Sequence, residues 1–145
     1  GFCGAYEPPE ALQPGQTIGP GNNNFPTFRQ YLTESSILHP SKLFVILDEH
    51  PDSINDGYFQ SDPHTDVSQW SPEEWNDLPA SYHDGACGIA FADGHSEVHM
   101  WKSKVCTIVP VIYKPWQGRA IPFIADPAGV QDATWLALVT GGMPL

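Results

Sequence analysis

Basic residues are scarce in this chain of 145 residues. Six lysines and arginines stand against 17 aspartates and glutamates, so the formal net charge is −11. Because Lys and Arg supply the contacts to phosphate groups, this shortage argues against nucleic acids and anionic lipids as partners. The sequence also has no apolar run near the ~18 residues of a membrane helix, no secretory signal peptide at its start and no Asn-x-Ser/Thr sequon. An acidic surface suits divalent cations or an extracellular setting.

Cysteine motifs are missing as well. Cys3, Cys87 and Cys106 have no C-x-x-C spacing, which excludes a zinc ribbon and a thioredoxin motif. For Cys87, a buried free thiol and a disulfide to Cys3 or Cys106 are both open. There is no Gly-x-Ser-x-Gly elbow, and none of the three cysteines has a persuasive basic neighbour. We therefore expect no enzyme activity.

Length and composition predict one domain of strands and loops over residues 1–145, and the helices predicted below make its fold class α+β. The chain is large enough for a single core but too small for two. Its 15 prolines, 13 glycines and low content of charged residues favour short elements joined by long loops. Residues 1–30 show no periodicity and are predicted to be irregular.

Three strands are predicted, one of them at the edge of a sheet. Residues 43–48 form a continuous apolar run of β-type residues, typical of a strand buried on both faces. Residues 58–60 are expected to return as a short partner strand. Residues 105–113 alternate weakly and contain Pro110, which indicates an edge strand.

Two helices are predicted from capping signals. Ser71, Pro72 and Glu74 make a capping box before a short helix near Trp75, which should end by Pro79. Residues 127–140 carry apolar residues at mixed spacing before the Gly-Gly pair at 141–142, a plausible helix stop. We expect a C-terminal helix there.

Asp93-Gly94 is a strong signal for a β-hairpin with a two-residue type I′ turn. Centring the turn on this pair predicts the cross-strand partners Ala92–His95, Ala90–Glu97, Gly88–His99 and Ala86–Trp101. Because side chains alternate across a strand, the other face is apolar and should be buried. That face would carry Cys87, Ile89, Phe91, Val98 and Met100.

Two clusters could bind a metal ion. The segment after the apolar strand is dense in oxygen ligands that suit Ca²⁺, namely Asp48, Glu49, Asp52, Asn55 and Asp56. Its spacing is not that of an EF-hand, and an ordinary Asx-rich turn loop is the competing interpretation. On the second hairpin strand, His95, Glu97 and His99 project from one side and could supply three ligands to a transition metal. A solvated polar face explains the same pattern.

Nine residues separate His83 from Asp93-Gly94, and the turn lies in the run Phe-Ala-Asp-Gly-His-Ser-Glu-Val-His over 91–99. This spacing resembles the C-terminal signature of the prepilin-type proteins known as H-X9-DG or DUF1559-like. Residues 40–57 and 78–83 also look like segments of that family, so the likeness covers roughly residues 36–102. It implies that His83, Asp93 and Gly94 are architectural, with His83 hydrogen-bonding a neighbouring loop or chain.

Such proteins are similar to the pseudopilins of type II secretion and to type IV pilins, in which a hydrophobic N-terminal helix precedes a globular domain on an antiparallel sheet. The resemblance implies a non-enzymatic bacterial subunit of an extracellular filament or pseudopilus, at the cell surface or in the periplasm. Other pilin-like subunits would be its partners, and membrane contact would require the N-terminal helix. That helix is not among these residues, so either the sequence starts after it or processing removed it. An apolar sheet face that packs on the helix is implied too.

Two other functions fit some of these residues. A secreted carbohydrate-binding or recognition module would use exposed tryptophans and a Ca²⁺ loop. Ca²⁺ binding in a sheet loop is common in major pseudopilins, so the resemblance also allows a bound Ca²⁺ ion. A metal-dependent hydrolase would use His95, Glu97 and His99. No cofactor is required by the sequence.

Overall fold

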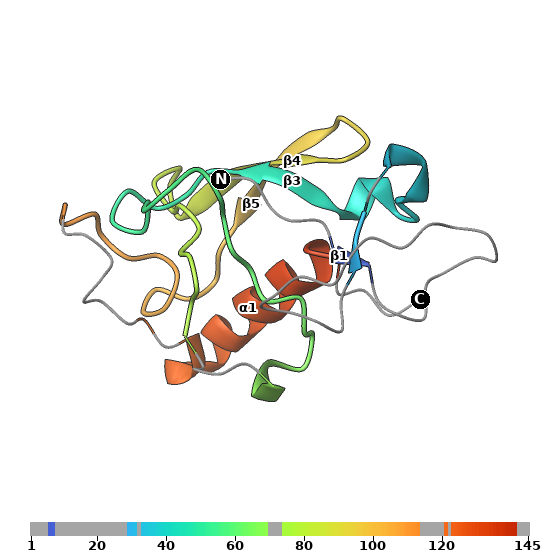
Figure 1. Ribbon diagram of the computed structural model, residues 1–145. Helices are drawn as coiled ribbons and strands as arrows, with labels where there is room; N and C mark the ends of the chain where they lie inside the picture. Colours follow the sequence, from blue (N-terminus) through green and yellow to red (C-terminus); the bar gives the residue numbers. More distant parts are fainter. Residues whose placement is uncertain are drawn as a thin grey trace.

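The computed structural model describes residues 6–7, 29–31, 33–69, 74–113, 121 and 123–141. Within them the chain forms a small antiparallel sheet with one α-helix beneath it (Figure 1), which confirms the α+β class. The strands are β1 (Tyr6–Glu7), β2 (Arg29–Gln30), β3 (Phe44–Leu47), β4 (Ala86–Phe91) and β5 (Ser96–Met100). The helix is α1 (Pro127–Val139), and short 3₁₀ turns lie at Glu34–Ser36, Pro40–Lys42, Val67–Gln69 and Phe123–Ala125.

The main sheet has the strand order β3-β4-β5, with both neighbouring pairs antiparallel. The apolar run expected over residues 43–48 supplies β3, but the expectation that it is buried on both faces is wrong. Phe44 and Leu47 are buried, whereas the Ile46 side chain is 49% exposed. A break in register between Phe44 and Ile46 turns Ile46 to the uncovered face.

The hairpin of β4 and β5 forms around Asp93-Gly94, but its register differs from the expected one by one residue. Ala86 pairs with Met100, Cys87 with His99 and Gly88 with Val98. The turn is a three-residue loop rather than type I′: the Phe91 N–H donates to the His95 carbonyl at 2.9 Å, and the Gly94 N–H donates to the Phe91 carbonyl at 3.0 Å.

Only one residue of the Asp93-Gly94 pair has the positive φ that a type I′ turn needs twice. Gly94 has φ +90, and Asp93 is not among the residues with positive φ. This is a type I turn followed by a glycine bulge, a common alternative for the same dipeptide. The extra loop residue shifts β5 by one position, and a one-residue shift moves every side chain of a strand to the opposite face.

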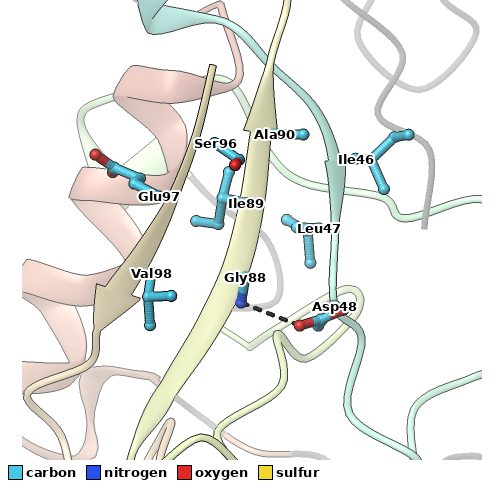
Figure 2. Close-up of a pocket in the computed structure, with 9 residues that line it drawn as sticks. All are labelled: Ile46, Leu47, Asp48, Gly88, Ile89, Ala90, Ser96, Glu97 and Val98. Atoms are coloured by element: carbon cyan, nitrogen blue, oxygen red, sulfur yellow. Dashed lines mark hydrogen bonds between the residues drawn. The ribbon is translucent and has the colours of Figure 1, made fainter. Parts of the chain in front are cut away.

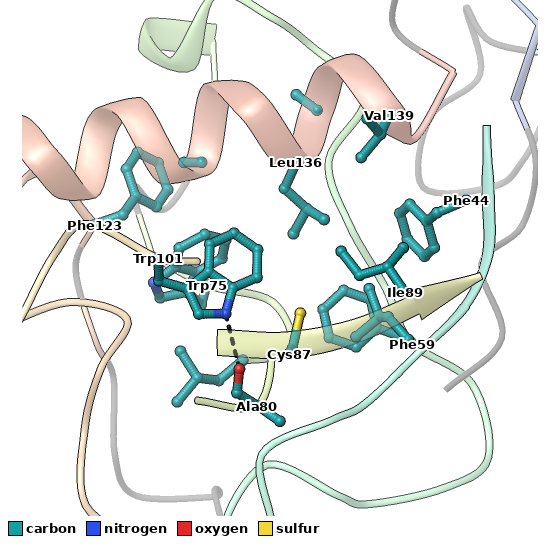
Figure 3. Close-up of a cluster of buried hydrophobic side chains, with 14 of the residues drawn as sticks. Phe44, Phe59, Trp75, Ala80, Cys87, Ile89, Trp101, Phe123, Leu136 and Val139 are labelled. Carbon is teal, nitrogen blue, oxygen red and sulfur yellow. Dashed lines mark hydrogen bonds between the residues drawn. The ribbon is translucent and has the colours of Figure 1, made fainter. Parts of the chain in front are cut away.

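The predicted apolar face is therefore divided between the two sides of the sheet. Cys87, Ile89 and Phe91 on β4 are buried against α1, with Leu136 and Val139 pointing toward the sheet (Figure 3). Val98 and Met100 on β5 lie on the opposite side and are 69% and 56% exposed. The sheet thus has one covered and one open face.

The predicted C-terminal helix is confirmed as α1. Its N-cap is Asp126, whose side chain accepts the N–H groups of Ala128 and Gly129, and Pro127 takes the first helical position. The buried Asp132 carboxylate accepts N–H groups from Lys102 and Ser103 at 2.9–3.1 Å and the Thr107 hydroxyl at 2.9 Å. The helix therefore holds in place a segment that has no regular structure of its own.

Three other secondary-structure predictions are wrong. Residues 58–60 form no strand, and residues 105–113 are turns and irregular chain. Residues 74–79 are not helical, because tertiary contacts hold the backbone: the Trp75 N–H donates to the Ile121 carbonyl at 3.2 Å, and Glu49 forms an isolated antiparallel bridge with Pro79. Ser71, Pro72 and Glu73 of the expected capping box, and most of residues 1–30, lie outside the described residues.

The core lies between the covered sheet face and α1. Trp101 and Trp75 are buried there. The Trp101 indole N–H donates to the Ala80 carbonyl (Figure 3), and the Trp75 indole N–H donates to the Cys106 carbonyl. Cys87 and Cys106 are buried free thiols, and Cys3 lies outside the described part of the chain. No helix among the described residues has the length and apolar character needed to span a membrane.

Candidate functional site

His83 of the motif binds the end of β3. Its Nε2 lies 3.2 Å from Oδ2 of Asp48, the residue that follows β3. The same oxygen accepts the N–H of Gly88 at 3.0 Å, and the Asp48 N–H donates to the Gly88 carbonyl. Asp48 therefore joins the start of β4 to the end of β3, and His83 closes that junction from the solvent side.

This junction favours glycine at position 88. A Cβ atom there would lie 2.9 Å from Oδ2 of Asp48, so the carboxylate would have to shift. With glycine, the carboxylate can approach the β4 backbone closely. The partner of His83 and the preference for Gly88 could not be read from the sequence, since both depend on the pairing of β3 with β4.

Asp93 and Gly94 lie at the other end of β4, in the turn. Oδ1 of Asp93 accepts the backbone N–H of His95 at 3.2 Å and lies 2.5 Å from Nδ1 of the His95 imidazole. The hydrogen bond from His95 lowers the pKa of Asp93. The length of β4 thus separates His83 from Asp93 and Gly94. The motif residues make two structural contacts, one at each end of β4, rather than one reactive centre.

The open face of the sheet carries a shallow groove of about 460 Å³ (Figure 2). Its floor is the small residues Gly88 and Ala90 on β4, and the apolar side chains of Ile46 and Val98 stand on either side. Asp48, Ser96 and Glu97 add polar groups at the rim. Small residues in the middle of the sheet leave room for another element to approach the backbone closely.

The structure does not bring the expected Ca²⁺ ligands together. Asp48 binds His83 and Gly88, Asp52 accepts the Ile112 N–H at 2.7 Å, and Asp56 accepts the Tyr58 N–H at 2.7 Å. Asn55 is exposed, and Glu49 is buried. Over the described residues no three His, Cys, Asp or Glu side chains are grouped to hold a metal ion. The loop is an Asx-rich turn whose carboxylates cap backbone N–H groups.

Glu49 instead lies in a carboxylate pair that the sequence did not indicate. Its side chain is 7% exposed, and Oε1 is buried with no hydrogen-bond partner in the described structure. Burial and the nearby charge of Asp77 raise the pKa of Glu49 to about 7, against a partial offset from the Ser53 hydroxyl. Burial also raises the pKa of Asp77, which accepts the Gln60 N–H. As the pH falls through about 7, Glu49 therefore takes up a proton beside Asp77.

The second expected metal cluster, His95, Glu97 and His99, is engaged in packing. The His95 ring stacks on Phe91 with centroids 4.4 Å apart, and His99 stacks on Trp135 at 3.4 Å. Glu97 is exposed. Burial lowers the pKa of His99, which keeps the imidazole neutral against the indole. The expected convergence of the three side chains on one point is not observed.

The described tryptophans do not form an exposed platform for sugars. Trp75 and Trp101 are core residues, and Trp135 is half-buried between His99 and Trp101. The other two tryptophans lie outside the described residues. The three described tryptophans thus belong to the core or pack against it.

Comparison of the chain with known proteins gives no match to any family model, to any curated protein or to any solved structure. The likeness to H-X9-DG proteins therefore depends on the motif residues and their spacing. Structurally, the motif braces the two ends of β4 and borders an open apolar sheet face.

Proposed function

We propose that this chain is a non-enzymatic structural subunit, the globular domain of a pilin-like or pseudopilin-like protein in an extracellular filament or secretion pseudopilus. The observation that carries the proposal is the open apolar face of β3-β4-β5, where Ile46, Val98 and Met100 are exposed around a floor of small residues. Exposed apolar surface of this kind marks an interaction site in a soluble protein.

The occupant we propose for this face is an apolar helix, as the family resemblance implies. Residues 46, 88, 90 and 98 line the groove on the face of the sheet that α1 does not cover, and the groove is open to solvent rather than a closed cavity. A helix laid in it would bury Ile46 and Val98 on its two sides. Each fully buried aliphatic side chain would contribute about 1.5–3 kcal/mol relative to exposure.

The two contacts of the motif, one at each end of β4, support this interpretation. The Asp48–His83 contact and the Asp93–His95 turn fix the ends of the strand that forms the groove floor. Both pairs are at least partly exposed, and in each the carboxylate also accepts a backbone N–H, from Gly88 and from His95. Such a motif maintains a shape, which is what a subunit interface needs.

The first test is to read the coding DNA immediately upstream of Gly1. A prepilin cleavage site followed by a continuous apolar helix is the expected result. An ordinary secretory signal peptide, or a catalytic domain in the same reading frame, would contradict the proposal.

The second test places a charge in the groove of the full-length protein. Ile46→Lys should abolish incorporation of the subunit into sedimentable filaments, because a lysine in the groove opposes docking of an apolar helix. Val105→Lys is the matched control, since Val105 is exposed but lies outside the sheet. Normal assembly of Ile46→Lys subunits would refute the role of this face.

A further inference from the structure

Strand β5 presents a row of outward-pointing backbone groups along one edge of the main sheet. Strand β5 is at the edge of the order β3-β4-β5, and within the described residues it pairs with β4 alone. Its side chains are mostly exposed, including the apolar Val98 and Met100. Long apolar edges invite pairing with another strand, and folded proteins usually protect them with charge, proline or a covering loop.

The register of the hairpin determines which backbone groups point outward. Hydrogen bonds join Phe91 to His95 and Trp101 to Gly85, so the alternate residues His95, Glu97 and His99 direct their N–H and C=O groups toward β4. Ser96, Val98 and Met100 must then direct theirs away from the sheet. The same three residues carry their side chains on the open face.

We propose that a second copy of this chain pairs with β5 in antiparallel orientation, with Val98 opposite Val98 of the other copy. The pairing joins two three-stranded sheets into one of six strands. It is a closed, two-fold interface, and it does not depend on the filament proposal.

Self-complementarity of the strand favours this occupant over an unrelated peptide. In the register centred on Val98, Ser96 lies opposite Met100 in both halves, and outward-pointing residues meet in hydrogen-bonded pairs. Glu97 lies opposite His99 in the closer, non-hydrogen-bonded pairs, so each half places a carboxylate against an imidazole. The neutral His99 ring has an N–H with which it can donate to that carboxylate.

The association should be weak and favoured by salt. Pairing of two five-residue strands covers less than the roughly 1,200 Å² of the smallest stable interfaces, so we expect a dissociation constant in the micromolar range or above. Two chains that each carry a net charge of −11 repel one another, and added salt screens that repulsion.

Cysteine cross-linking tests the register directly. In a Cys3→Ser background, Val98→Cys should form a disulfide-linked dimer under mild oxidation, because facing residues of a hydrogen-bonded pair lie about 5.5 Å apart between Cα atoms, within disulfide range. Ser96→Cys alone and Met100→Cys alone should stay monomeric, whereas a mixture of the two should cross-link. The buried Cys87 and Cys106 thiols should not interfere.

Sedimentation of the wild-type chain over a concentration series gives an independent readout. Val98→Lys, which sets two lysines opposite each other, should raise the dissociation constant at least tenfold without changing the melting temperature. Ile46 lies on β3, away from the β5 edge, so Ile46→Lys should leave the dissociation constant of the dimer unchanged. This result would distinguish the dimer interface from the proposed filament interface. A monomer at millimolar concentration, a dimer insensitive to Val98→Lys, or equal cross-linking of Val98→Cys and Val105→Cys would each overturn the proposal.

Discussion

Replacing Glu49 with glutamine should remove most of a pH dependence of stability between pH 5 and 8. Glu49 is buried, Oε1 has no partner in the described structure, and the pKa is raised from 4.5 to about 7 by burial and by Asp77. The folded protein therefore holds a proton on Glu49 that the unfolded chain releases near pH 4.5.

The sign and size follow from proton linkage. Because the pKa is raised on folding, the contribution of Glu49 is fully present below about pH 4.5 and is lost as the pH rises through 7. A shift of this size corresponds to about 3 kcal/mol in the free energy of unfolding. The raised pKa of Asp77 acts in the same direction. Glu49 and Asp77 should thus make the wild-type domain progressively less stable from pH 5 to pH 8, whereas the lowered pKa of His99 acts in the opposite direction as the pH rises toward 6.5.

Urea denaturation at pH 5, 6, 7 and 8 measures the effect. Glu49→Gln keeps the shape of the neutral acid, so it should resemble wild type at pH 5 and exceed its stability by up to about 3 kcal/mol at pH 8. Asp66→Asn is the control: Asp66 is exposed, hydrogen bonds from Ser68 lower its pKa, and its removal should not change the slope above pH 5. Parallel curves for wild type and Glu49→Gln would refute the assignment of a neutral, buried acid.

Four further substitutions test the contacts at the two ends of β4 and the helix. Gly88→Ala should destabilise the fold by about 1–2 kcal/mol, since its Cβ forces the Asp48 carboxylate away from the β4 backbone, and amide exchange at residue 88 should rise. Gly94→Val should cost about 1 kcal/mol or more at φ +90, whereas Asp93→Gly should not stabilise the protein as a type I′ turn would predict; melting temperatures compare the two. Asp126→Ala should cost about 1 kcal/mol through loss of the helix N-cap, measured by thermal denaturation, and an unchanged melting temperature would contradict the capping role.

The features predicted correctly from sequence are those set by local chemistry. The apolar run gave β3, the Asp93-Gly94 pair placed a turn, and residues before the Gly-Gly pair formed α1. The predicted register of the hairpin is wrong because Asp-Gly is compatible with two turn geometries whose loops differ by one residue, and no neighbouring residue distinguishes them. The helix expected near Trp75 does not form over residues 74–79, because burial of Trp75 and its backbone hydrogen bond to Ile121 contribute more than the capping residues.

The candidate site was predictable only in part. The spacing of His83 and Asp93-Gly94 marked the correct hairpin, but the partner of His83 depends on the pairing of β3 with β4. The carboxylates of the expected Ca²⁺ cluster are near one another in sequence, but in the structure most of them accept hydrogen bonds from separate backbone N–H groups. Glu49 and Asp77 meet only through tertiary contacts, for which the sequence carries no periodic signal.

The buried carboxylate of Asp132 has a consequence for the order in which this domain can be completed during synthesis. It supplies the acceptors for backbone and hydroxyl groups of residues 102–107, which precede it in the chain. Until the ribosome has released the residues of α1, the N–H groups of Lys102 and Ser103 and the Thr107 hydroxyl lack the carboxylate that accepts them in the folded domain, and the covered face of the sheet lacks its helix. The sheet is therefore synthesised before the helix that covers it, and we expect it to become protease-resistant only once α1 has formed.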